Sequence, residues 1–181
     1  LITKTVYKIK CIDMENIPSE GPALIIPNHI SWIDALLIVS SQQRRVRFLM
    51  SREVYEKKPI RKWLATKARV IPIQSGEGPE KIKESLRLAR NALDEGYLVC
   101  IFAEGHISRN GIMMGFRKGF THILDGTDYP IIPMYIAGAW GSISSYANGL
   151  PFKSLPKQFP YPITLIAGKP LQGNSTPFQV R

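Results

Sequence analysis

The sequence lacks several features that would point directly to a metal-binding or secreted protein. It has only two cysteines and three histidines in 181 residues. Cys11 and Cys100 do not have the spacing of a metal site, and the histidines offer no convergent ligand set. We therefore expect no bound metal and no disulfide framework. Cys100 lies within the apolar run YLVCIFA, where a buried reduced thiol is expected, and this favours the cytoplasmic side of a cell.

Long hydrophobic runs are also missing. ALIIP, ALLIV and ITLIAG fall far below the roughly 18 apolar residues that a membrane-spanning helix needs. The apolar content of 44% suits one compact domain. The chain begins with Leu1 and shows no signal-peptide pattern. We expect a single domain over residues 1–181, cut from a longer protein.

Acidic residues are scarce: 14 of them face 24 lysines and arginines, for a net charge of +10. The excess is concentrated in segment 44–69, where basic residues outnumber the two acidic ones, Glu53 and Glu56. The basic residues of this segment are Arg44, Arg45, Arg47, Arg52, Lys57, Lys58, Arg61, Lys62, Lys67 and Arg69. Such a patch attracts anionic lipid headgroups, coenzyme A phosphates, an acidic carrier protein or nucleic acid, unless it is simply a solvated face. Nucleic acid is disfavoured because no recognition motif accompanies the charge.

Hydrophobic periodicity predicts an α/β domain. Runs typical of strands occur at 7–13, 23–27, 47–50, 70–73, 97–103, 130–138 and 163–168. Patterns typical of helices occur at 32–40, 52–68, 79–95 and 120–125. This alternation predicts a largely parallel central sheet flanked by helices, whose ligands bind beyond the carboxyl ends of the strands. His29 and Glu104 would both lie at that edge.

The stretch NHISWID (28–34) supports a structural and a chemical interpretation. Ser31, three residues ahead of Asp34 and an apolar run, has the form of a capping box that opens a helix. The same geometry folds the Asp34 carboxylate back toward His29, so a cap and a His–Asp pair are compatible. Imidazole is suited to accept a proton near neutral pH, and a carboxylate on its other nitrogen fixes the tautomer.

A second motif lies downstream in IFAEGHISRNG (101–111), where an apolar strand ends in a carboxylate and a glycine. Together the two motifs resemble the glycerolipid acyltransferase family, which esterifies a lysophospholipid hydroxyl. Its Asn-His-x-Ser-x-x-Asp motif is matched in full from Asn28 to Asp34, and its Phe-Pro-Glu-Gly motif is matched except at Ala103. The lead-in ENIPSEGPALIIP, the segment GFRKGF (115–120) and the strand IIPMYIAG (131–138) follow the family order.

The resemblance implies an O-acyltransferase with specific residue roles. His29 would act as general base and Asp34 would orient it. Glu104 and Gly105 would hold the glycerol backbone, and the candidates for phosphate contact are Arg109, Arg117 and Lys118. Because the chain has no Gly-x-Ser-x-Gly elbow, we expect direct transfer without an acyl-enzyme intermediate. His106 is a further candidate for the acceptor site.

The co-substrates implied are a lysophospholipid and an acyl thioester, either acyl-CoA or acyl-carrier protein, with no other cofactor. The expected location is an anionic membrane surface on its cytoplasmic face, reached peripherally or through sequence outside this chain. Two alternative functions remain open: a hydrolase that uses the same His–Asp pair on water, and a non-catalytic lipid-binding domain. Trp32, Trp63 and Trp140 could face a bilayer or an acyl chain, but core packing is expected for at least two of them.

Two departures from the family motifs bear on the acceptor. Ser75 and Ile107 stand where many members have an arginine, and guanidinium groups suit the terminal phosphate monoester of lysophosphatidic acid. We therefore expect a substituted headgroup, lysophosphatidylethanolamine first, as in the 2-acylglycerophosphoethanolamine acyltransferase type. The alternative is lysophosphatidic acid, if other cations replace the missing arginines.

Overall fold

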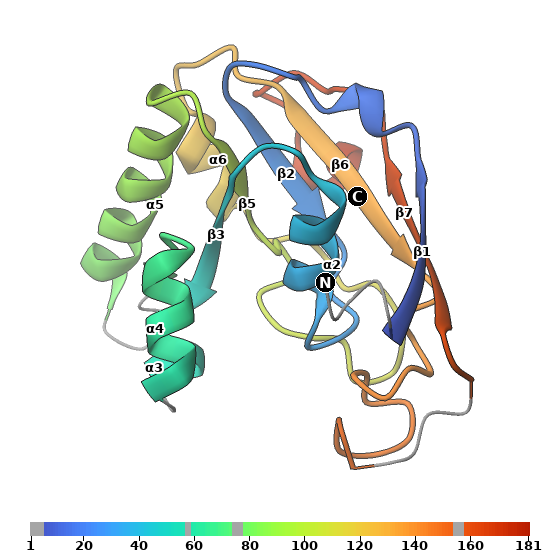
Figure 1. Ribbon diagram of the computed structural model, residues 1–181. Coiled ribbons are helices and arrows are strands. Elements are labelled where there is room, and N and C mark those ends of the chain that lie inside the picture. Colours follow the sequence, from blue (N-terminus) through green and yellow to red (C-terminus); the bar gives the residue numbers. More distant parts are fainter. Residues whose placement is uncertain (1–5, 57–58, 74–77, 154–157) are drawn as a thin grey trace.

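The computed structural model describes residues 6–56, 59–73, 78–153 and 158–181 (Figure 1). Within these residues the strands are β1 (Tyr7–Ile12), β2 (Ala23–Pro27), β3 (Val46–Ser51), β4 (Ile71–Ile73), β5 (Leu98–Cys100), β6 (Ile131–Ala137) and β7 (Tyr161–Ala167). The helices are η1 (Met14–Asn16), α2 (Asp34–Ser41), α3 (Arg52–Glu56), α4 (Pro59–Lys67), α5 (Pro79–Asp94), α6 (Gly119–Leu124) and α7 (Pro177–Val180).

The strands form one sheet in the order β1-β7-β6-β2-β5-β3-β4. β2 pairs in parallel with β5 and β6, and β3 pairs in parallel with β5 and β4. Only the outer pair differs in direction, since β7 runs antiparallel to β6 while β1 runs parallel to β7. The predicted α/β domain with a largely parallel sheet flanked by helices is therefore confirmed.

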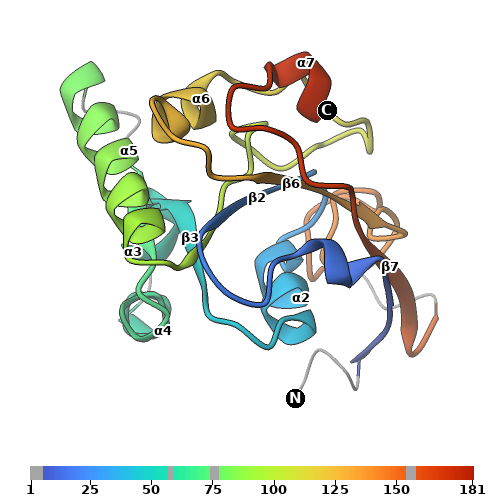
Figure 2. The ribbon, with the colours of Figure 1, turned by 90° about the horizontal axis from the view of Figure 1, so that it is seen from above.

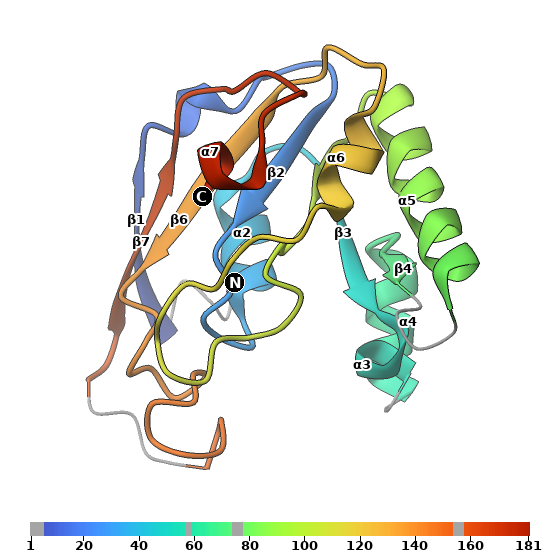
Figure 3. The same ribbon diagram turned by 180° about the vertical axis from the view of Figure 1, so that it is seen from behind.

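Helices cover both faces of the sheet (Figures 2 and 3). Alternate residues of β2 enter two separate cores: Leu24 and Ile26 pack on the side of α5, α6 and α7, whereas Ile25 packs on the side of α2. All five residues of β2 are buried. A strand buried on both faces has no polar alternation, which explains the continuous apolar run ALIIP.

Several predicted boundaries differ from those observed. The helix expected over 32–40 begins at Asp34, and the helical region 52–68 divides into α3 and α4, with Pro59 at the first position of α4, where its missing N–H costs nothing. The strand expected over 97–103 pairs only from Leu98 to Cys100. The Ile101 amide still donates to the Ile25 carbonyl of β2 at 3.1 Å, and the chain then turns, with the Gly105 amide donating to the Phe102 carbonyl.

The carboxyl ends of the central strands meet at one edge of the sheet. β2 lies between β5 and β6 and runs parallel to both, so the segments that follow these three strands come together there. Among the described helices, none combines the length and apolar character needed to cross a bilayer.

Candidate active site

His29 and Asp34 form a hydrogen-bonded pair at the end of β2. The imidazole Nδ1 lies 2.9 Å from the Asp34 Oδ2 atom. The Asp34 side chain is fully buried, whereas that of His29 keeps 19% of its surface exposed. Because an ionised carboxylate only accepts hydrogen bonds, Nδ1 must carry the proton, which leaves Nε2 with a lone pair able to take another.

Three further contacts hold the Asp34 carboxylate. Its Oδ2 accepts the backbone amides of Ile30 at 2.7 Å and Ser31 at 2.9 Å, and its Oδ1 accepts the Ser31 hydroxyl at 2.5 Å. The prediction that the Asp34 carboxylate folds back toward His29 is thus confirmed. The prediction that Ser31 caps the helix is wrong: Ile33 is the N-cap residue of α2 and no side chain caps it. The Ser31 hydroxyl is instead used to fix Asp34.

Asn28 anchors this segment to the neighbouring strand. Its side-chain amide donates to the Ile136 carbonyl at 3.2 Å, and its carbonyl oxygen accepts the Ile136 amide at 2.6 Å. The last backbone pair of the ladder is Pro27 with Met134, so the Asn28 side chain extends the pairing one step past the strand. This contact fixes where His29 leaves the sheet.

The segment after β5 encloses His29 from the other side. The ring of Phe102 stacks on the imidazole, with centroids 3.9 Å apart and planes 19° from parallel. Glu104, 2% exposed, accepts the His29 amide at 2.7 Å and the Met114 amide at 2.7 Å through its two oxygens. The Ser108 amide donates to the His29 carbonyl at 2.9 Å. The sequence motif containing Phe102 gave no indication of this stacking.

Gly105 allows a guanidinium to lie against the backbone. Its φ of +83° is in the region that favours glycine, and a Cβ there would lie 2.8 Å from Cζ of Arg117. The Arg117 amide donates to the Ala103 carbonyl at 2.8 Å, which closes the loop between them. The two predicted substrate residues Gly105 and Arg117 are thus in contact.

A cleft of about 960 Å³ opens beside the His–Asp pair. One part of its wall is polar and includes His29, His106, Arg109, Asn110, Arg117 and Tyr146. The other part is apolar and includes Phe48, Leu49, Met50, Val54, Ile73, Ile82 and Leu86. This cavity is large enough for a drug-sized ligand, and its wall combines polar and apolar side chains, as an acyl compound combines polar and apolar parts.

The predicted cations are distributed unevenly around the cleft. Arg109 and Arg117 both line it, and the Arg109 guanidinium lies 5.4 Å from the centre of the Tyr146 ring. Lys118 is exposed at the N-cap of α6 and is not part of the wall. Ile107 lines the cleft, whereas Ser75 falls outside the described residues. Tyr146, which the sequence did not indicate, holds one of the two arginines.

The basic segment 44–69 does not form one uniform surface. The Arg44 guanidinium donates to the carbonyls of Pro18, Gly21 and Gly96. Arg47 pairs with Glu95 at 3.4 Å. Charges that remain exposed include Arg45, Lys62, Lys67 and Arg69, while Lys57 and Lys58 lie outside the described residues. Part of the basic excess therefore stabilises the fold.

Two of the three tryptophans are exposed, which contradicts the expectation that at least two pack in the core. Trp32 is 38% and Trp63 is 56% exposed, and Trp32 lines the cleft. Trp140 packs partly against the core on the α2 side.

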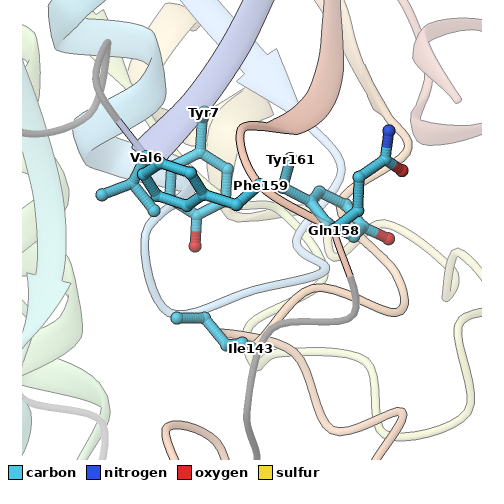
Figure 4. A pocket seen from close by; sticks show the side chains of 6 residues that line it. All are labelled: Val6, Tyr7, Ile143, Gln158, Phe159 and Tyr161. Atoms are coloured by element: carbon cyan, nitrogen blue, oxygen red, sulfur yellow. The ribbon is translucent and has the colours of Figure 1, made fainter.

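A second cavity lies at the start of β1 and β7, between Tyr7, Phe159 and Tyr161 (Figure 4). Its volume of about 10 Å³ is enough for one water molecule at most. None of its lining residues belongs to the cleft, so it has no part in the chemistry of the His–Asp pair.

The chain is similar to several known acyltransferases. It is 26% identical over 145 residues to the chloroplastic 1-acyl-sn-glycerol-3-phosphate acyltransferase LPAT1 of Arabidopsis thaliana, covering 80% of this chain and 40% of that protein. It is 32% identical over 127 residues to a 1-acyl-sn-glycerol-3-phosphate acyltransferase of Cocos nucifera, covering 67% of this chain and 40% of that one. The chain thus spans about two fifths of the length of these relatives.

The fold has a counterpart among solved structures. The crystal structure of the 1-acyl-sn-glycerophosphate (LPA) acyltransferase PlsC from Thermotoga maritima superposes with a TM-score of 0.71 at 21% identity, covering 95% of this chain and 67% of that one. The family model described as Acyltransferase matches residues 8–137, a range that contains the His–Asp pair, the strand end at Glu104 and both cleft arginines. The chain therefore belongs to the glycerolipid acyltransferase family.

Proposed function

We propose that this chain transfers a fatty acyl group from an acyl thioester to the free glycerol hydroxyl of lysophosphatidic acid. The observation that carries the proposal is the fully buried Asp34 bound to His29, at the wall of a cleft that has both guanidinium groups and an apolar arm. A proton acceptor, an anion-binding wall and room for a hydrocarbon chain are the three elements that this reaction needs.

The mechanism follows from the protonation of the pair. With Nδ1 held by Asp34, Nε2 of His29 takes the proton of the glycerol hydroxyl as its oxygen attacks the thioester carbonyl carbon. The carboxylate of Asp34 stabilises the imidazolium that forms. The tetrahedral intermediate then collapses, the carbon–sulfur bond breaks, and the imidazolium returns its proton to the departing thiolate. The products are the diacyl lipid and a free thiol.

The acceptor proposed here replaces the substituted headgroup expected from the sequence. That expectation rested on the absence of arginine at positions 75 and 107, but Arg109 and Arg117 line the same cleft as His29. Guanidinium groups suit a terminal phosphate of nearly two charges. The curated relatives cited above are named for the phosphate monoester acceptor. Both facts favour lysophosphatidic acid over lysophosphatidylethanolamine.

The apolar arm of the cleft is suited to the acyl chain. Side chains from β3, α3, β4 and α5 line it, including Phe48, Val54, Ile73 and Leu86. Burying methylene groups in such a wall contributes about 0.8 kcal/mol for each CH₂. The donor is either acyl-CoA or acyl-carrier protein, and the chain meets its lipid acceptor at an anionic membrane surface.

The test compares kcat/KM for lysophosphatidic acid and lysophosphatidylethanolamine with one acyl-CoA donor and mass spectrometry of the products. We expect diacyl lipid to form faster from lysophosphatidic acid, and transfer to fall by about 10²-fold or more in the variant His29→Ala. A thioesterase would release free fatty acid whether or not lysolipid is present, and a lipid-binding domain would release nothing. A tenfold preference for the phosphoethanolamine acceptor would overturn the headgroup assignment while leaving acyl transfer intact.

A further inference from the structure

We propose that Glu104 is a positioning residue for His29, and that it makes no contact with the substrate. Its carboxylate ties the backbone of the general base to the loop that carries the cleft arginines. The kinetic effect that we predict for Glu104 rests on the proposed acyl transfer. The hydrogen bonds by which Glu104 positions His29 do not depend on which acceptor is used.

The hydrogen bonds and the burial of Glu104 direct its carboxylate to the protein backbone and limit the access of a substrate. Oε1 accepts the His29 amide and Oε2 accepts the Met114 amide, both at 2.7 Å. The residue is 2% exposed. Its neighbours Ala103 and Gly105 line the cleft, but Glu104 does not. A glycerol hydroxyl in the cleft would therefore meet these neighbours rather than the carboxylate.

The chemistry of this position requires a carboxylate. Both partners are N–H donors, so both side-chain oxygens must accept, and glutamine offers only one acceptor atom. A buried carboxylate needs charge-assisted hydrogen bonds to offset its lost hydration. No described lysine or arginine side chain forms a salt bridge with Glu104, so the two amides provide that compensation.

His29 is held on three sides by the segment that contains Glu104. Its amide is bound by Glu104, its carbonyl by the Ser108 amide at 2.9 Å, and its ring by the face of Phe102 at 3.9 Å. These contacts come from residues about 75 positions away along the chain. Together with Asp34 they determine where Nε2 points, and a displacement of about 1 Å in a reacting group costs roughly a hundredfold in rate.

The kinetic test uses Glu104→Gln with Glu95→Gln as its matched control. The control removes one carboxylate charge at a half-exposed ion pair with Arg47, away from the cleft wall. We expect Glu104→Gln to lower kcat by about 10²-fold while KM for lysolipid and for acyl-CoA stays near that of the unmodified chain. The double variant with His29→Ala should be no slower than His29→Ala alone, because Glu104 acts through His29. A large rise in KM for lysolipid, or further loss in the double variant, would overturn the proposal and indicate substrate contact.

A second measurement needs no activity. In the unmodified chain, two-dimensional NMR should show the amides of His29 and Met114 shifted downfield and protected from hydrogen exchange, since each donates a short bond to a carboxylate. In Glu104→Gln, one or both should lose protection, and the His29 ring resonances should move. If these amides exchange rapidly in the unmodified chain, the proposal fails. If the chain transfers no acyl group to lysophosphatidic acid, the proposed function fails and the NMR measurement still decides the role of Glu104.

Discussion

Replacing Asp34 with asparagine tests how the carboxylate supports His29. The four hydrogen bonds to Asp34 are divided unequally: Oδ2 accepts from the His29 ring and from two backbone amides, whereas Oδ1 accepts only the Ser31 hydroxyl. In Asp34→Asn the amide oxygen should occupy the Oδ2 position, where it satisfies three donors. The NH₂ group then faces Ser31, whose hydroxyl can rotate and accept.

This arrangement keeps the tautomer of His29 and removes only the negative charge. A hydrogen bond to a charged group is worth about 1.5–3 kcal/mol and a neutral one about 0.5–1.5 kcal/mol, so the imidazolium formed during transfer loses roughly 1–2 kcal/mol of stabilisation. That corresponds to a decrease in kcat of roughly 5- to 30-fold. Loss of the base itself costs about 10²- to 10⁴-fold, so the two variants should be clearly separable.

The assay is kcat and kcat/KM for lysophosphatidic acid, with thermal unfolding of each variant to show that the fold is intact. Ser31→Ala is the companion variant, because it removes the hydroxyl contact to Oδ1 and leaves the charge. We expect it to reduce kcat less than Asp34→Asn does. If kcat falls as far in Asp34→Asn as in His29→Ala, the claim that Asp34→Asn preserves the tautomer of His29 is refuted. If kcat of Asp34→Asn is undiminished, the charge of Asp34 has no role in transfer.

Three other outcomes are expected. His29→Ala should remove nearly all transfer, by about 10²-fold or more, with circular dichroism unchanged; retention of more than about a tenth of turnover contradicts the base assignment. Binding to vesicles should require anionic lipid and weaken with salt, because exposed charges of segment 44–69 contribute to it; equal binding to neutral vesicles at raised salt would argue against this. Burial, and secondarily the charge of Asp34, raises the pKa of the Cys100 thiol well above its ordinary value, so iodoacetamide at neutral pH should label exposed Cys11 in the folded chain and Cys100 only after unfolding. Rapid native labelling of Cys100 would contradict its burial.

The sequence predicted those parts of the site that are local along the chain. His29 and Asp34 are five residues apart, and their contact is set by the turn between β2 and α2, so the motif alone located the pair. The strands also carry local patterns, which is why the strand predicted over 23–27 has the same bounds as β2. The edge at which His29 and Glu104 meet followed from the parallel arrangement of the strands.

The contacts that cross the sheet were not predictable in the same way. Stacking of Phe102 on His29 and the bond from Met114 to Glu104 depend on how the loop after β5 folds. Ser31 was assigned to a helix cap because serine near a helix start usually is one, and only the position of the Asp34 carboxylate shows its actual use. Core packing was expected for at least two of the three tryptophans, but Trp32 lies at the cleft and Trp63 is 56% exposed.

The headgroup question shows how position in the cleft can matter more than position in a motif. Ile107 occupies the place of a family arginine, and from the sequence this looked like a lost phosphate contact. In the folded chain the loop after Gly105 comes back to the segment from which it starts, and the Arg117 amide donates to the Ala103 carbonyl at 2.8 Å. This brings the Arg117 guanidinium against Gly105, where a Cβ would collide with it. A guanidinium therefore lies beside the strand end although the residue that carries it comes ten positions later in the chain than the motif residue. Under the proposed function, the phosphate of the acceptor would interact with charge at a point in space, so a loop of suitable length could replace one arginine by another without loss of the interaction.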